Sequence, residues 1–171
     1  MTTPPRPVPP QADPKETGGS APEDAGSLRE FERSLPMALL RAREAVMDRF
    51  RPMLRSFGVT EQQWRVLRAL RDASEIDVSA LADRCHILAP SLSRILRDLS
   101  ERGLVSRRAS ETDHRVGLIS ITDEGLRLIL DVGPHSEAHY ARIAEAVGDE
   151  DLRRLYALLE RLEARLRDSE S

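Results

Sequence analysis

The chain has 171 residues, of which 40% are hydrophobic and 32% charged, and its formal net charge is −3. This composition is ordinary for a globular protein with one domain-sized core. We expect no transmembrane helix, because no run of 18 apolar residues occurs, and no secretory signal, because no apolar segment follows Met1. The single cysteine, Cys85, cannot form an internal disulfide, which fits a reducing compartment. We therefore expect a cytoplasmic protein without a membrane partner.

The distribution of charge is more informative than its sum. Between residues 84 and 115 the chain carries seven arginines and four acidic residues, a local net charge of +3. A negative overall charge gives no argument for nucleic-acid binding, whereas a local basic cluster does. Any attraction to DNA is expected in this segment.

The first 27 residues differ in composition from the rest of the chain. They contain seven of the eleven prolines and almost nothing apolar. Such a segment cannot bury enough surface to offset its ordering entropy. We expect a disordered, proline-rich tail over residues 1–27 and a single domain over residues 28–171.

Apolar residues at helical spacing predict a first helix over about residues 34–57, with Pro36 in its first turn and a bend at Pro52. Thr60 and Gln63 then have the spacing of a capping box. The box predicts a second helix, which carries Trp64, Leu67 and Leu70, followed by a loop over residues 72–77.

Two further helices with a short break between them are predicted over residues 78–103. Val78, Leu81, Ala82 and Cys85 share one helical face, and the period breaks over residues 86–89. Pro90 suits the first turn of the next helix. In that helix the buried positions are Leu92, Ile95, Leu96 and Leu99, and the opposite face carries Ser91, Ser93, Arg94 and Arg97. This is the pattern of a helix-turn-helix, whose second helix enters the DNA major groove.

A β-hairpin, which we call the wing, is predicted next, with strands at about 104–108 and 116–121 and a polar tip over residues 109–115. In the tip, Asp113 stands two residues before Arg115 and could hold its guanidinium extended for a DNA minor groove. A solvated surface hairpin with an incidental ion pair is the alternative.

The last part of the chain is predicted to be helical. Thr122 caps a helix that runs to about Val147, with a kink at Gly133-Pro134. A final helix begins near Asp149. Its leucines follow a spacing typical of a helix-packing seam: Leu152, Leu155, Leu159, Leu162 and Leu166.

Several of these motifs together resemble the winged-helix signature of the MarR family. They are Leu81-Ala82-Asp83-Arg84, Ser91-Leu92-Ser93-Arg94-Ile95-Leu96, Leu99-Ser100-Glu101-Arg102-Gly103-Leu104-Val105, Asp113-His114-Arg115 and Ile121-Thr122-Asp123-Glu124-Gly125. Further matches are similar to the branch that represses homoprotocatechuate degradation operons: Leu40-Arg41-Ala42-Arg43-Glu44-Ala45, Phe50-Arg51-Pro52, Thr60-Glu61-Gln62-Gln63-Trp64-Arg65 and Cys85-His86-Ile87-Leu88-Ala89-Pro90-Ser91. The wing departs from the family pattern, because Val116 stands where a second arginine is usual.

The resemblance implies a mainly helical fold with a small β-hairpin wing, and a homodimer on a near-palindromic operator in double-stranded DNA. The helix-turn-helix and wing would occupy about residues 77–121, and the dimerisation helices about 34–57 and 122–168. The residues expected to contact DNA are Pro90, Ser91, Ser93, Arg94, Arg97, Arg107, Arg108, Asp113, His114 and Arg115. The implied function is repression of an aromatic-compound catabolic operon, released by a phenolic acid.

A pocket for an aromatic carboxylate requires a flat apolar wall and a fixed cation. The residues expected to form it are Arg41, Arg43, Met47, Trp64, Arg65, Leu67, Cys85 and His86. For these residues, core packing and surface arginines that extend to solvent are the alternative. The effector could instead be an aryl-CoA thioester such as a hydroxycinnamoyl-CoA, or the protein could bind DNA without an effector.

Other functions have less support in the sequence. No nucleophile–base pair or glycine-rich phosphate loop stands out, so we expect neither an enzyme nor a cofactor. His135 and His139 have a metal-ligand spacing, but no third ligand is indicated and no metal is expected. Cys85 could sense oxidants, although its apolar helix face favours inert packing.

Overall fold

The computed structural model describes residues 30–73, 75–110 and 117–169. The chain divides into two compact units, residues 1–38 and 39–171. In the first unit, the described residues form a short 3-10 helix, Phe31–Arg33, and the start of the first long helix. The expected tail over residues 1–27 lies outside the described residues, and the domain boundary beside it stays a prediction.

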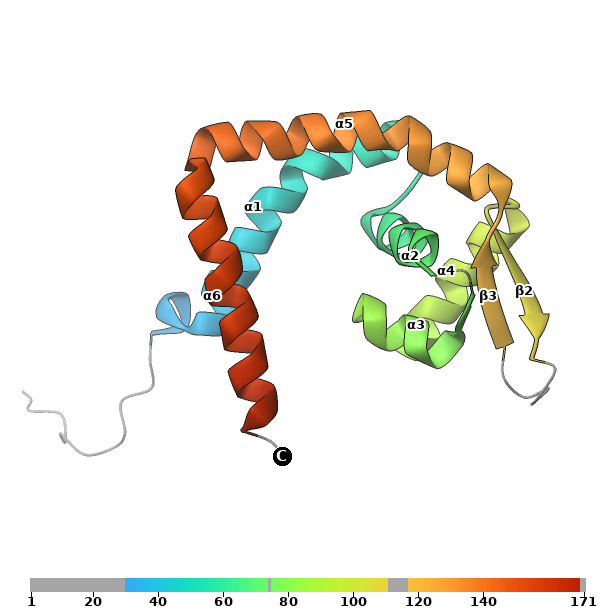
Figure 1. The fold of residues 1–171 in the computed structure, drawn as a ribbon, viewed down its shortest axis with the longest axis horizontal. Coiled ribbons are helices and arrows are strands. Elements are labelled where there is room, and N and C mark those ends of the chain that lie inside the picture. The colour runs from blue at the N-terminus through green and yellow to red at the C-terminus, as the bar shows by residue number, and fades with distance from the viewer. Residues whose placement is uncertain (1–29, 74, 111–116, 170–171) are drawn as a thin grey trace, which may run out of the picture. The chain divides into compact units, whose positions relative to one another are not determined.

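The described residues form a mainly helical fold with a small antiparallel sheet, as predicted (Figure 1). The elements are α1 (Leu35–Ser56), α2 (Glu61–Arg71), β1 (Ile76–Asp77), α3 (Val78–Cys85), α4 (Ala89–Glu101), β2 (Val105–Ala109), β3 (Gly117–Ile121), α5 (Asp123–Val147) and α6 (Asp149–Asp168). The predicted helix-turn-helix corresponds to α3 and α4, and the wing strands correspond to β2 and β3.

Three helices begin at capping side chains. The Thr60 hydroxyl accepts from the Gln63 amide while the Gln63 side chain accepts from the Thr60 amide, so the predicted capping box is confirmed. Asp77 accepts from the Ala80 amide at the start of α3. Thr122 caps α5 by accepting from the amide of residue 125. These contacts satisfy backbone donors that have no partner within the helix.

The turn between α3 and α4 depends on one left-handed residue. His86 has φ 49° and ψ 51°, a conformation that costs strain for a residue with a Cβ. It allows the Ile87 amide to return to the carbonyl of Ala82 at 3.0 Å. The sharp turn then lets α4 begin within a few residues.

The sheet has the order β1-β3-β2. The expected loop over residues 72–77 is wrong at its end, because Ile76 and Asp77 form β1 and pair with Ile119 and Leu118 of β3. Two residues cannot show the alternation by which a strand is recognised in a sequence. The first wing strand, β2, begins one residue later than expected, and residues 111–116, which include the expected start of the second wing strand, lie outside the described residues.

The predicted inner face of α4 lies in the main core: Leu92, Ile95, Leu96 and Leu99 are all at most 9% exposed. The same core contains Leu67 of α2 and residues of α1, α3, β2, β3 and α5. Truncating such a buried leucine to alanine typically costs about 2–5 kcal/mol. The core therefore fixes which face of α4 is left for solvent.

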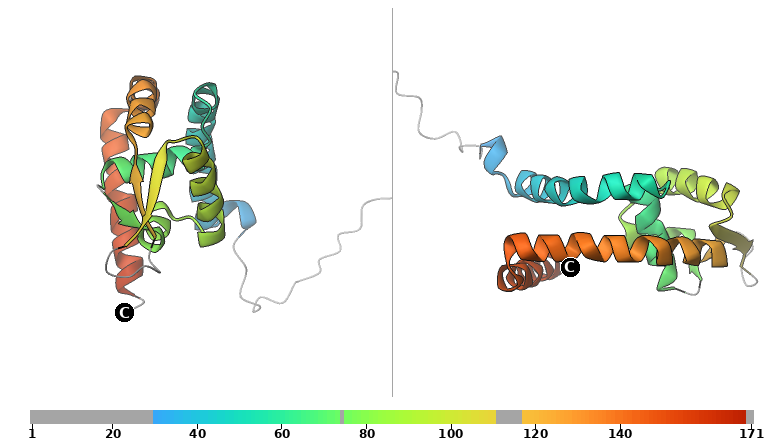
Figure 2. Two further views of the ribbon diagram at one scale, coloured as in Figure 1. Left: turned by 90° about the vertical axis from the view of Figure 1, so that its right-hand side faces the viewer. Right: turned by 90° about the horizontal axis from the view of Figure 1, so that it is seen from above.

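Helix α5 runs alongside α1 (Figure 2). Aromatic rings make contacts between the two helices. The ring centroids of Phe50 and Tyr140 lie 5.0 Å apart, and those of Phe57 and His135 lie 5.2 Å apart. Tilted rings at this separation attract each other beyond their burial. Both helices continue past their internal prolines, Pro52 and Pro134.

The first turn of α5 passes too close to the preceding chain for a side chain. A Cβ on Gly125 would lie 2.2 Å from the carbonyl oxygen of Leu104 and 2.7 Å from the Ile121 side chain. Because a backbone oxygen cannot rotate away, we predict that Gly125→Ala lowers the free energy of unfolding by about 2–3 kcal/mol. Urea denaturation would measure it.

The control is Glu124→Ala, which truncates the exposed neighbour of Gly125. Exposed substitutions of this kind usually change stability by less than about 0.5 kcal/mol. If Gly125→Ala were as stable as this control, the close packing of α5 against residue 104 would be contradicted.

Candidate nucleic-acid interface and effector pocket

The face of α4 opposite the core carries polar and cationic side chains. Ser93, Arg94 and Arg97 are exposed, and Ser91 is half-buried. Within the described ranges, no ion pair is formed by Arg94 or Arg97. The hydroxyl of Ser93 donates to the Ala89 carbonyl at 3.0 Å, so its oxygen is left to accept a hydrogen bond.

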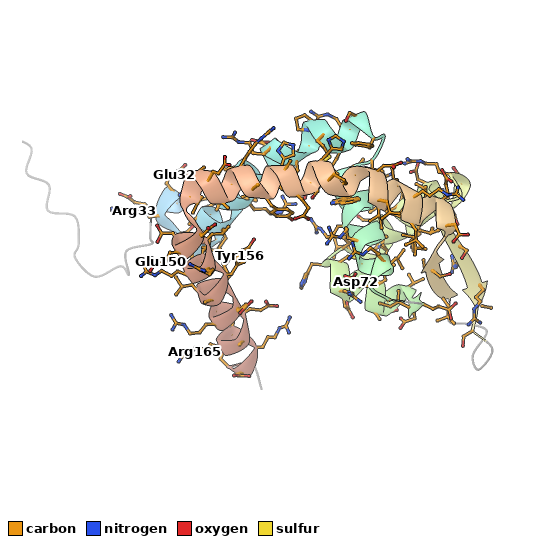
Figure 3. All side chains as sticks on the ribbon, turned by 45° about the horizontal axis from the view of Figure 1, so that its top comes forward. Glu32, Arg33, Asp72, Glu150, Tyr156 and Arg165 are labelled. Atoms are coloured by element: carbon orange, nitrogen blue, oxygen red, sulfur yellow. The ribbon has the colours of Figure 1, made fainter. Side chains whose placement is uncertain are left out.

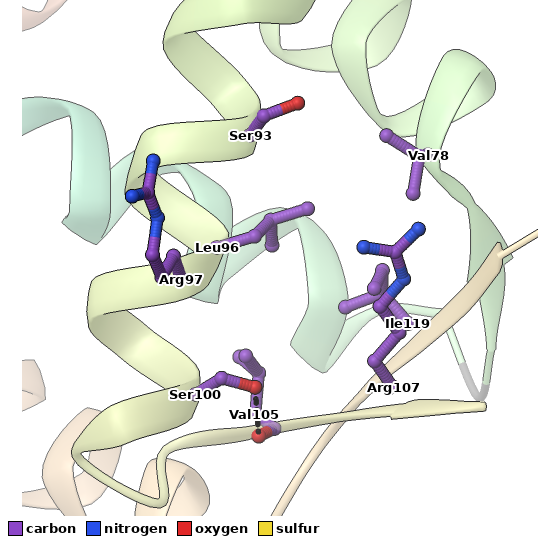
Figure 4. Close-up of a pocket in the computed structure, with 8 residues that line it drawn as sticks. All are labelled: Val78, Ser93, Leu96, Arg97, Ser100, Val105, Arg107 and Ile119. Atoms are coloured by element: carbon purple, nitrogen blue, oxygen red, sulfur yellow. Dashed lines mark hydrogen bonds between the residues drawn. The ribbon is translucent and has the colours of Figure 1, made fainter.

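A hollow of about 390 Å³ separates this face from the wing (Figure 4). Arg97 of α4 and Arg107 of β2 border it, and Val78 of α3 closes one end. Arg107 can lie across β3 because residue 117 is glycine: a Cβ there would be 2.9 Å from the guanidinium. The hollow therefore has cationic groups on both sides.

The other predicted DNA contacts differ in their surroundings. Pro90 lies in the first turn of α4, where no amide hydrogen is required. Arg108 donates two hydrogen bonds to the carboxylate of Glu75, at 2.7 and 2.5 Å. This partner was not predicted, because Glu75 lies 33 residues from Arg108 in the chain. The remaining predicted contacts, Asp113, His114 and Arg115, lie outside the described residues.

A second hollow, of about 360 Å³, lies among four helices. Four of the predicted ligand residues line it: Met47, Trp64, Arg65 and Cys85. It is also lined by residues that the sequence interpretation did not select: Glu61, Arg68, Ala69, Asp72, Arg84 and Tyr140. We call this hollow the effector pocket; Asp72, at its edge after α2, is labelled in Figure 3.

The other predicted ligand residues do not line the effector pocket. Leu67 is fully buried in the main core. His86 is exposed in the α3–α4 turn and borders a different hollow. Arg41 is exposed on α1. Arg43 reaches the edge of the pocket only through the carboxylate of Glu61.

Glu61, only 16% exposed at its side chain, gathers three guanidiniums. Arg43 forms an ion pair with it, Arg65 lies at 3.0 Å, and Arg51 lies at 3.2 Å. The two arginines expected to supply a free cation are thus engaged by a carboxylate. A ligand carboxylate would have to compete with Glu61 for either of them.

Arg68 differs from these arginines. Its Nε is buried and has no hydrogen-bond partner among the described residues. Its Cζ lies 5.7 Å from the centroid of the Trp64 ring, within cation–π range. A buried donor without an acceptor costs free energy, so the pocket contains a cationic donor that a bound carboxylate would satisfy. A sequence signal existed, since Arg68 follows Trp64 by one helical turn.

Tyr140 brings a phenol to the pocket from α5. Partial burial raises the pKa of Tyr140. Its hydroxyl therefore stays protonated at neutral pH and can both donate and accept a hydrogen bond.

Two hydrogen bonds connect α2, which carries most of the pocket, to the helix-turn-helix. Arg65 Nη1 donates to the Cys85 carbonyl at the end of α3 at 3.1 Å. Gln63 Nε2 donates to Asp98 Oδ2 on α4 at 2.6 Å. Movement of these α2 side chains would therefore change hydrogen bonds to both α3 and α4.

Cys85 and His139 are packed against other side chains of the protein. Cys85 is 1% exposed, and burial raises the pKa of its thiol, which favours the packing interpretation. His139 packs on Phe50 with ring centroids 5.3 Å apart. In the part of the chain that the structure describes, no three His, Cys, Asp or Glu residues are grouped to hold a metal ion, and no helix is long and apolar enough to cross a membrane.

Comparison with known proteins agrees with the winged-helix fold. Residues 57–116 match the model of the MarR family. The HTH-type transcriptional regulator FarR of Neisseria gonorrhoeae is 38% identical over 136 residues, which cover 80% of this chain and 92% of that protein. The homoprotocatechuate degradative operon repressor of Escherichia coli is 41% identical over 127 residues, covering 74% and 86% respectively.

Among solved structures, NadR in complex with 4-hydroxyphenylacetate superposes with a TM-score of 0.68 at 36% identity, covering 80% of this chain and 96% of NadR. The fold and relatives define a winged-helix transcription regulator. The chain belongs to the MarR family. It is a DNA-binding transcriptional repressor of that family.

The ion pair of Glu44 with Arg51, beside the pocket, makes the stability of the protein depend on pH. Arg51 donates to Glu44 at 2.5 Å, and this hydrogen bond lowers the pKa of Glu44 below its usual 4.5. A carboxylate with a depressed pKa stabilises the folded state above its unfolded-state pKa and loses that effect as the pH falls through the folded-state value. We predict that Glu44→Gln lowers Tm at neutral pH and that the difference from wild type narrows below pH 4.5.

Thermal scans of both proteins across this pH range would measure the effect. Glu124→Gln, which removes an exposed carboxylate paired with Arg127, is the control and should change Tm little. An equal Tm deficit for Glu44→Gln at neutral and acidic pH would contradict the ion-pair explanation.

Proposed function

We propose that this protein represses an aromatic-compound catabolic operon and releases the operator when a phenolic acid binds in the effector pocket. The observation that carries the proposal is the buried, unpartnered Nε of Arg68 beside the Trp64 ring. The names of two relatives support it: one represses a homoprotocatechuate degradative operon, and another was crystallised with 4-hydroxyphenylacetate.

The pocket has the chemistry that a small phenolic acid requires. In the proposed complex, the carboxylate accepts from Arg68 and the ring packs on Trp64 and Met47. The phenolic hydroxyl would reach Tyr140 or the carboxylate of Glu61, which both line the pocket. A volume of about 360 Å³ suits one such molecule. An aryl-CoA thioester would have to leave most of its nucleotide outside.

On the DNA side, we propose that α4 enters the major groove and that Ser91, Ser93 and Arg94 contact base edges. Ser93, as an acceptor, would suit the amino groups of adenine or cytosine, and Arg94 would suit guanine. Arg97, Arg107 and Arg108 would contact phosphates. For Arg108, a phosphate oxygen would replace the Glu75 carboxylate as the partner of the guanidinium. The wing-tip residues 113–115 remain proposed contacts.

A homodimer would present two copies of α4 to a near-palindromic operator. The terminal helices offer the surface for it. On α6, Leu155, Leu159 and Leu166 are 46%, 37% and 57% exposed, and Tyr156 on the same helix is 52% exposed (Figure 3). Several exposed apolar side chains along one helix are typical of an interface rather than of a solvated helix.

Effector release requires that the ligand bind better to the form of the dimer that does not fit the operator, since equal affinity shifts nothing. A ligand hydroxyl at Glu61 would disturb its bond to Arg65, whose other donor is bound to the Cys85 carbonyl. This is the proposed route from the pocket to α3.

The DNA proposal is tested by Arg94→Ala. Loss of a bidentate contact to guanine should weaken operator binding by about 1–3 kcal/mol and relax the sequence preference at one base pair of each half-site. Fluorescence anisotropy with single-base operator variants would measure both effects. The control is Arg127→Ala on α5. Unchanged affinity and preference for Arg94→Ala would exclude α4 as the helix that recognises sequence.

The effector proposal is tested by Arg68→Met, which keeps an unbranched side chain in place of the arginine stem but removes the guanidinium and its charge. We expect operator affinity to be unchanged and Tm unchanged or raised, because an unsatisfied buried donor disappears. Release by 4-hydroxyphenylacetate or 3,4-dihydroxyphenylacetate should require at least about tenfold more ligand, since a hydrogen bond to a charged group is lost.

Arg55→Met, on α1 outside the effector pocket, is the matched control. Hydroxycinnamates and hydroxycinnamoyl-CoA form separate arms of the titration, and release by the thioester alone would favour that effector class. Release by none of these compounds would contradict the effector proposal while leaving the DNA prediction standing.

A further inference from the structure

Leu88 is the most exposed large hydrophobic residue among those the structure describes, at 79%. It occupies the N-cap of α4, where no side chain caps the helix. Serine, threonine, aspartate and asparagine are favoured at this position because their side chains accept from the first amides of the helix. The same chain uses Thr60, Asp77 and Thr122 for this purpose on α2, α3 and α5.

The backbone on either side of Leu88 is fixed. Ile87 is buried, and its amide donates to the Ala82 carbonyl at 3.0 Å. The carbonyl of Leu88 accepts from the Leu92 amide at 3.0 Å, which is the first hydrogen bond of α4. An ordered turn therefore holds the leucine side chain in solvent at the start of α4. This arrangement is unfavourable in two ways, because the helix lacks a side-chain cap and an apolar side chain is exposed to water.

DNA, the proposed ligand of the start of α4, has one kind of apolar group that Leu88 could contact. Residues at the start of the second helix of a helix-turn-helix contact base edges in the major groove. On those edges the only apolar group is the C5-methyl of thymine, and apolar side chains recognise it. Ser91, Ser93 and Arg94 end in polar groups. Of the exposed apolar residues at this end of α4, which are Leu88, Ala89 and Pro90, the leucine has the largest side chain.

We infer that Leu88 is a specificity-determining residue that packs against a thymine methyl group in each operator half-site. The inference rests on the proposed role of α4 in the major groove. It accounts for a leucine where a capping residue would make the free protein more stable. Burying one methyl group corresponds to about a fourfold gain in affinity.

A neighbour within the protein is the competing explanation for Leu88. Arg167 of α6 lines the same hollow, which has a volume of about 450 Å³. If Leu88 packed there, replacing it would cost stability. If Leu88 contacts DNA instead, Leu88→Asn should raise Tm, because asparagine can cap α4, and should weaken operator binding.

The deciding experiment uses an operator selected by the full-length protein from random duplexes. Each thymine is replaced in turn by deoxyuridine, which removes only the methyl group, and Kd is measured for wild type, Leu88→Ala and Leu88→Asn. We expect one thymine per half-site at which uracil weakens wild-type binding about fourfold, and no effect of that substitution on either variant.

Two results would overturn the inference: a wild type indifferent to uracil at every position, or Leu88 variants that keep the wild-type sensitivity. Arg94→Ala on the same duplexes separates this failure from a failure of the proposed function. If Arg94→Ala weakens binding while the Leu88 variants keep their uracil sensitivity, only the role of Leu88 is wrong.

Discussion

The carboxylate of Glu61 is the interaction on which the arrangement around the effector pocket depends. It meets Arg43 and Arg51 of α1 and Arg65 of α2, and Arg65 also donates to the end of α3. Removing Glu61 would leave these three guanidiniums without the carboxylate that they share. This one side chain therefore relates the long first helix to the helix-turn-helix, and a ligand that contacts it can influence both.

Two features of the protein reduce its own stability, and both lie where a ligand is proposed. The buried Nε of Arg68 has no acceptor among the described residues, and Leu88 exposes an apolar side chain at a position that favours a cap. Natural proteins break local rules of packing and hydrogen bonding chiefly at functional sites. In this account, one cost is recovered when the effector binds and the other when DNA binds.

The sequence predicted what depends on local patterns. The spacing of Leu92, Leu96 and Leu99 identified the inner face of α4, and Thr60 with Gln63 identified the start of α2. Features that depend on distant partners were missed. The two-residue β1 exists only through pairing with β3, and Tyr140 reaches the effector pocket from a helix far along the chain. The ion pair of Arg43 with Glu61 likewise joins two helices, and it could not be distinguished beforehand from a free cation.

The proposed function requires that the effector pocket and the DNA-binding surface be energetically coupled, and coupling of binding equilibria must be reciprocal. Isothermal titration calorimetry of 4-hydroxyphenylacetate into the free protein and into its saturated operator complex would measure this coupling. We expect the complex to bind the ligand more weakly, by the same factor by which the ligand weakens operator binding. Equal ligand affinity in the two titrations would contradict it.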